Sequence, residues 1–184
     1  MVLGLIIAIA IPVILVLFVW GLYNGLIRLK NQVANAWAQI DVQLKRRADL
    51  IPNLIETVKG YMKHEKSVLE NVTKARTSLM GAQSVSDKAN SDNMLTGALK
   101  SLFAVSENYP QLKASENFMQ LQEEITGTEN KVAYARQHYN DTVMEFNTKI
   151  ELFPHVIFAR ILNFVQKDMF KATEQERKNV KVSF

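Results

Sequence analysis

The chain has 184 residues, a formal net charge of +4 at pH 7 and no cysteine. The lack of cysteine excludes disulfide bonds, thiolate metal sites, cysteine nucleophiles and a lipid-modified N-terminal cysteine. The positive charge is modest and dispersed along the chain, so nucleic acid is not expected among the partners.

An uncharged segment opens the chain, because no acidic, basic or histidine residue precedes Arg28. About 20 mainly apolar residues in a helix suffice to cross a bilayer core, and a proline is tolerated in such a helix. Two aromatic residues lie near the end of the segment and two basic residues follow it, as at the boundary of a membrane span. Residues 1–27 are therefore predicted to be a transmembrane anchor in contact with membrane lipid. The residues assigned to this anchor are Pro12, Trp20, Tyr23, Arg28 and Lys30.

Two other interpretations of this segment fit less well. A cleaved signal peptide needs a basic start and a small-residue cleavage site, but the only A-x-A sequence, residues 8–10, lies in the middle of the apolar run. A soluble domain of this size would rarely bury so long an uncharged run. Basic residues follow the span at 28, 30 and 45–47, so the positive-inside rule predicts the N-terminus outside and the C-terminal domain in the cytoplasm.

Apolar residues recur in steps of three and four between residues 33 and 79, a pattern typical of long packed helices. Pro52 lies inside this pattern, where it removes one backbone hydrogen bond and crowds the carbonyl of Ala48. It is expected either to kink the helix near residues 49–51 or to begin a second helix, which Asp49 would cap. The sequence leaves both alternatives open.

A polar connection and a shorter helix are predicted next. Residues 81–92 are small and polar, with Ser91 or Asp92 as the expected N-cap of the following helix. The apolar face of that helix covers residues 95–105, and the helix should end before Pro110, because the residue before a proline resists helical angles.

A second long helix is expected to begin near Ser115 and to be ended by Pro154. The apolar residues 155–170 predict a short helix, and residues 171–184 form a charged tail. The predicted fold is all-α: an N-terminal transmembrane helix followed by an up-and-down antiparallel helical bundle with long helices in residues 28–170.

Two polar segments are candidate interaction sites. In the first, Arg47 occupies an apolar-stripe position, so its guanidinium is expected to meet a carboxylate or a helix-end carbonyl. This segment is either a structural kink with its own polar bonds or a site that sets partner and register. The second segment precedes a proline and is either a simple turn or a contact loop. The candidate residues are Asp41, Lys45, Arg46, Arg47, Asp49, Pro52, Asn53, Glu107, Asn108, Tyr109 and Pro110.

No pattern in the sequence indicates catalysis or a bound cofactor. The three histidines have no metal-ligand spacing, and the chain contains neither a glycine-rich phosphate loop nor a nucleophile motif. Neighbouring carboxylates such as Glu123 and Glu124 point in different directions on a helix and so form no acid/base pair. We therefore expect no catalytic, cofactor or metal residue and no enzymatic activity.

Helix lengths favour self-assembly. The first stripe is about 70 Å long and the second about 53 Å, whereas the helix between them is only about 25 Å long. Either the first helix folds back at Pro52 or neighbouring chains cover the remaining apolar surface. A homo-oligomer is therefore expected, and the residues chosen for its contact stripe are Leu54, Val58, Val72 and Phe146.

Several long motifs carry a resemblance to a known family. They occupy residues 39–54, 58–61, 64–65, 107–114, 117–118, 121–122, 128–130, 135–136, 139–140 and 180–184. Together they resemble the bacterial LemA family over nearly the whole chain, although residues 153–159 depart from it where family members more often have small polar residues. The resemblance implies a helical bundle behind one membrane helix and no established enzymatic activity. Relatives are linked to magnetosome membrane formation, and some LemA genes neighbour a membrane-bound zinc metalloprotease.

These observations predict a non-enzymatic scaffold in the bacterial cytoplasmic membrane that self-associates and organises or shapes the membrane. The alternative is an adaptor or regulator for another membrane protein, such as a membrane-bound metalloprotease. The two differ in stoichiometry, because a scaffold forms large homo-oligomers alone, whereas an adaptor stays small until its partner is present.

Overall fold

The computed structural model describes residues 2–170, apart from the side chain of Leu5, and the predicted charged tail of residues 171–184 lies outside them. Within residues 2–170 the chain forms helices and no strand, so the predicted all-α class is confirmed. The helices are α1 (Val2–Lys59), α2 (Lys66–Gly81), α3 (Val85–Ser106), α4 (Pro110–Lys113), α5 (Glu116–Glu151) and α6 (His155–Ile161).

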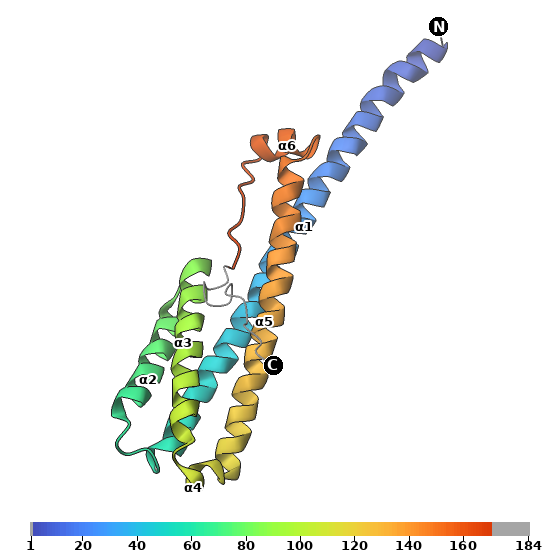
Figure 1. The fold of residues 1–184 in the computed structure, drawn as a ribbon. Helices are drawn as coiled ribbons and strands as arrows, with labels where there is room; N and C mark the ends of the chain where they lie inside the picture. Colours follow the sequence, from blue (N-terminus) through green and yellow to red (C-terminus); the bar gives the residue numbers. More distant parts are fainter. Residues whose placement is uncertain (1, 171–184) are drawn as a thin grey trace, which may run out of the picture.

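Four helices form the up-and-down bundle (Figure 1). The long helices α1 and α5 pack side by side in opposite directions, and α2 and α3 form a hairpin that packs beside part of this pair. The first residues of α1 project from the bundle at the end where α6 lies, which we call the anchor end. The opposite end, which holds α4, is the far end.

The first long helix continues through Pro52 and ends at Lys59, before a turn at residues 60–65. Because proline has no N–H, the carbonyl of Ala48 receives no helical hydrogen bond. The Nε atom of Arg76 on α2 donates to this carbonyl oxygen at 2.9 Å. The expected helix start at Pro52 is therefore wrong, and Asp49, in the interior of α1, caps no helix.

The third helix begins earlier than expected. Ser84 is its N-cap, and the Ser84 Oγ atom accepts a hydrogen bond from the Asp87 N–H at 3.0 Å. Ser91 and Asp92 lie buried inside α3, so their expected role as N-cap is wrong. With 22 residues, α3 is about 33 Å long, longer than the apolar face alone indicated.

The expected oligomer stripe lies in the interior of a single chain. Its four residues, Leu54, Val58, Val72 and Phe146, are all fully buried. The turn at residues 60–65 divides the first stripe between α1 and α2. The α1 part packs against α5, and the α2 part packs against α3. The length mismatch that motivated the stripe as a contact between copies is therefore removed, and these residues are core residues.

Candidate functional site

The N-terminal part of α1 is a candidate membrane span, long and apolar enough to cross a bilayer. Up to Trp20 its described side chains are exposed, apart from the half-buried Ala10, and the buried core begins at Leu26. Among the predicted anchor residues, Pro12, Trp20 and Tyr23 are exposed on this part of the helix, and Arg28 and Lys30 follow it on the surface. The Lys30 Nζ atom lies 6.0 Å from the centroid of the Phe164 ring, which follows α6.

The fully buried side chain of Arg47 joins three helices. One guanidinium nitrogen donates to Asp92 Oδ1 at 2.8 Å and to Thr96 Oγ1 at 2.9 Å on α3. The other donates to Glu129 Oε2 on α5 at 3.1 Å. The expected carboxylate partner is thus present, and the geometry favours the structural interpretation of this residue, because the pairing fixes α1, α3 and α5 relative to one another.

Asp92 is the buried member of this polar cluster, whereas Glu129 is partly exposed. Burial raises the pKa of the Asp92 carboxyl above its ordinary value, and the Arg47 guanidinium opposes this shift. A cavity of about 300 Å³ adjoins the cluster and is also lined by Lys100 and Arg136. The Arg47 Nε atom is buried without a hydrogen-bond partner among the described residues.

The other candidates near Pro52 are spread over the surface of α1. Asp41 forms an ion pair with Lys88 of α3, and the Lys88 Nζ atom also lies 5.7 Å from the centroid of the Trp37 ring. Burial lowers the pKa of Lys88 below its ordinary value. The remaining candidates are exposed and do not converge with Arg47; they are Lys45, Arg46, Asp49, Pro52 and Asn53.

The turn before Pro110 connects elements at the far end. Glu107 forms an ion pair with Lys113 of α4, and the Tyr109 hydroxyl donates to Glu65 Oε1 at 3.4 Å. Pro110 is the first residue of α4, and Asn108 is exposed. These contacts tie the α3–α4 turn to the turn that precedes α2, so the segment has a structural role.

An extended segment after α6, residues 163–170, was not foreseen. Asn163 has a φ of 53°, a left-handed conformation that asparagine tolerates, and the chain then returns along the bundle (Figure 1). We call residues 163–170 the strap. The expected helix over residues 155–170 is thus correct only for α6.

Two asparagines of α5 hold the strap by its backbone. The Asn140 amide donates to the Phe170 carbonyl at 2.9 Å and accepts from the Phe170 N–H at 2.8 Å. The Asn147 amide makes the same two bonds to Lys167, at 2.9 and 2.8 Å. The seven-residue spacing places both amides on one face of α5. Only this spacing could have signalled the strap in the sequence.

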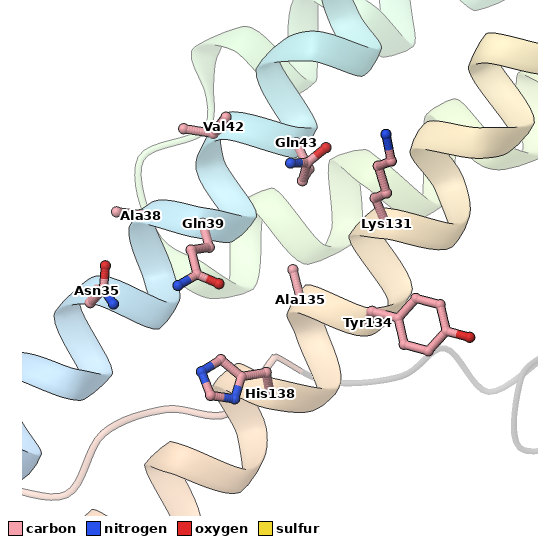
Figure 2. Close-up of a pocket in the computed structure, with 9 residues that line it drawn as sticks. All are labelled: Asn35, Ala38, Gln39, Val42, Gln43, Lys131, Tyr134, Ala135 and His138. Carbon is pink, nitrogen blue, oxygen red and sulfur yellow. The ribbon is translucent and has the colours of Figure 1, made fainter.

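A groove of about 620 Å³ runs between α1 and α5 (Figure 2). Figure 2 shows Gln39 and His138 reaching into the space between the two helices, while the Tyr134 ring points away from it. The Gln43 Oε1 atom is buried and has no hydrogen-bond partner among residues 2–170. The lining residues are Asn35, Ala38, Gln39, Val42, Gln43, Lys131, Tyr134, Ala135 and His138.

Sequence reasoning missed this groove although it has a signal. On each helix four lining residues repeat at i, i+3, i+4 and i+7, the spacing of one helix face. Their mixed polarity concealed the pattern. Within the part of the chain that the structure describes, no group of three or more His, Asp or Glu residues is placed to hold a metal ion.

Comparison with known proteins identifies relatives. A model of the LemA family matches residues 36–184. The chain is also 31% identical over 168 residues to "Protein LemA" of Metamycoplasma hominis, an alignment that covers 89% of this chain and 75% of that protein.

Proposed function

Because this chain belongs to the LemA family, we propose that it is a non-enzymatic scaffold, anchored in the bacterial cytoplasmic membrane, that self-associates through its helical bundle and organises membrane. The bundle lies on the cytoplasmic side in this proposal, because the basic residues near the span follow it. The resemblance to a family without established enzymatic activity supports the non-enzymatic role.

The observation that carries the proposal is the continuity of α1. This single helix has 58 residues and is about 87 Å long, and it passes without interruption from the uncharged segment into the bundle core. A continuous helix couples the bundle rigidly to the anchor. Anchored copies therefore share one orientation and one height above the membrane, which raises their effective concentration for one another.

The α1–α5 groove is the surface that we assign to self-association, in place of the buried stripe. Its lining comes from α1 and α5 alone, and Val42 and Tyr134 expose apolar surface at its sides. Anchored copies would present this face to neighbouring copies at the same height above the membrane.

The test is the mass of the full-length protein in detergent and in lipid nanodiscs. Val42→Glu places a charge beside the groove on a side chain that is 62% exposed, so the fold should survive. Met94→Glu on α3, at 57% exposure, is the matched control. The unmutated protein and the control should form the same oligomer, and Val42→Glu should form a smaller one. A monomeric unmutated protein in both media would refute self-association.

A second candidate function, an adaptor for another membrane protein, is favoured by a different surface. A groove of about 850 Å³ lies between α1 and α2 near the far end, with apolar residues such as Ile55 and Leu69 in its lining. Its basic residues outnumber its two acidic ones and are Lys59, Lys63, Lys66, Lys74 and Arg76. An acidic amphipathic helix of a partner fits this composition. Replacement of both Lys63 and Lys66 by Glu reverses two of these charges. It should abolish co-purification of such a partner without changing the mass of the homo-oligomer.

A further inference from the structure

The α6 region exposes an unusual amount of apolar surface at the anchor end. Phe153 is 80% exposed and Ile161 is 70% exposed. The exposed apolar residues of this region are Leu152, Phe153, Ile157, Ile161, Leu162 and Val165. Apolar side chains gathered in this way cost free energy in water and mark a surface that meets another apolar phase.

The same region lies against the candidate span. Phe158, Ile161 and Leu162 line an open hollow of about 510 Å³ together with residues of α1 between positions 15 and 23. Every residue that lines this hollow is apolar or aromatic. Figure 1 shows α6 at the end of α5, beside the point where α1 leaves the bundle. The apolar surface of α6 is therefore continuous with the apolar surface of the span.

The position at which α6 contacts α1 shows whether the exposed side chains of α6 would lie in lipid or in water. Leu15 lies about 20 Å before Arg28 along the helix, at ~1.5 Å per residue. A residue packed near Leu15 or Val19 thus lies within the depth of the bilayer whenever the span is inserted. At this height lipid would exclude water, so the side chains of Phe158, Ile161 and Leu162 that line the hollow would face acyl chains.

Polar groups around α6 suit the boundary of a bilayer. Arg28, Lys30 and Arg160 are exposed near this end of the bundle, where they can contact lipid phosphates. Exposed basic side chains thus accompany the apolar surface of α6, as in segments that bind at the membrane interface.

We propose that residues 152–165, including α6, are a second membrane-contacting element that inserts as a wedge into the leaflet where the span ends. This inference rests on the membrane anchoring in the proposed function. The occupant of the surface is lipid, since the apolar surface is continuous with the span. A wedge confined to one leaflet would also give the scaffold a direct means of bending the membrane.

The absence of cysteine permits a direct test. Single cysteines at Phe153 and Ile161 are labelled with a fluorophore that responds to polarity, in the full-length protein reconstituted into vesicles of phosphatidylethanolamine and phosphatidylglycerol. Met119→Cys, at an apolar site of α5 near the far end that is 50% exposed, is the control. Quenchers are attached to the lipid acyl chains in one experiment and dissolved in water in the other.

The expected result is several-fold stronger quenching by the acyl-chain quencher at 153 and 161 than at 119, with the reverse order for the aqueous quencher. Labels at 153 and 161 that are as accessible to water as the label at 119 would overturn the proposal. Labels shielded from both quenchers would overturn it too, because a protein partner would then cover the surface. Vesicle flotation separates the two proposals: if the protein floats with the vesicles, anchoring holds whatever the labels report.

Discussion

Replacement of Arg47 by methionine tests whether the buried polar cluster holds the bundle together. Methionine retains the bulk of the side chain but removes the donors to Asp92, Thr96 and Glu129. Removing one partner of a buried ion pair costs about 3–5 kcal/mol, because the other charge stays buried and unpaired. Nearly all of that cost should come from Asp92, since Glu129 is partly exposed and can be hydrated.

This cost can be measured by thermal unfolding of the detergent-solubilised full-length protein, followed by circular dichroism. For a chain of this size, ~1 kcal/mol lowers Tm by about 2–4 °C, so Arg47→Met should lower it by about 6–20 °C. Arg46→Met, the neighbouring exposed arginine, is the control and should change Tm little. Equal melting temperatures for the two variants would refute the argument.

The cluster also predicts a pH dependence with a definite sign. The pKa of Asp92 is raised in the folded protein, so the folded state holds this proton more tightly than the unfolded state does. The Asp92 contribution to stability is then greatest near or below the ordinary aspartate pKa of about 3.9 and is lost as pH rises through the folded pKa. Arg47→Met removes the opposing charge and should raise this pKa further. The difference in Tm between the variant and the unmutated protein should therefore shrink as the pH falls from 7.5 to 4.5, and a constant difference would contradict this.

Three other predictions concern the helix, the strap and the anchor. Arg76→Met should destabilise the bundle by about 1–3 kcal/mol, because it leaves the buried Ala48 carbonyl unpaired. Adding Pro52→Ala should restore stability, because alanine returns a backbone N–H to that carbonyl. If denaturant unfolding shows no rescue in the double variant, this account fails. Asn140→Ala removes both side-chain bonds to Phe170, so the Phe170 amide should exchange hydrogen markedly faster, while unchanged protection would argue against the strap. Alkaline carbonate should extract a chain that begins at Arg28 from membranes but should leave the full-length protein in them. Protease added to intact spheroplasts should spare the bundle of the full-length protein, and digestion from outside would reverse the proposed orientation.

The elements that depend on local chemistry could be predicted from the sequence alone. The uncharged start of the chain indicated a candidate span, and the steps of three and four indicated helices. Pro110 predicted the end of the helix before it, and α3 ends at Ser106 because the residue before a proline resists helical angles. The second long helix was expected to begin near Ser115, and α5 begins at Glu116. Arg47 was expected to need a carboxylate because an arginine in an apolar stripe must be paired, whatever the fold.

Tertiary structure decided the features that depend on residues far apart in the chain. The partner of Arg47 is Asp92, 45 positions later, and no local rule connects the two. Pro52 leaves α1 unbroken because Arg76, on another helix, satisfies the carbonyl that the proline leaves unpaired. The stripe at Leu54, Val58, Val72 and Phe146 is equally compatible with contacts within one chain or between chains, since periodicity specifies a buried face but not what buries it.

At the C-terminal end of the described residues, the strap and α6 also depend on contacts that the local sequence pattern does not predict. The apolar pattern after Pro154 predicts a helix over residues 155–170, but only α6 is helical. Side-chain amides of Asn140 and Asn147 bond to the strap backbone and so replace the hydrogen bonds that a helix would supply. Sequence pattern fixes which side chains must leave water, whereas the packing of distant elements decides what they then contact.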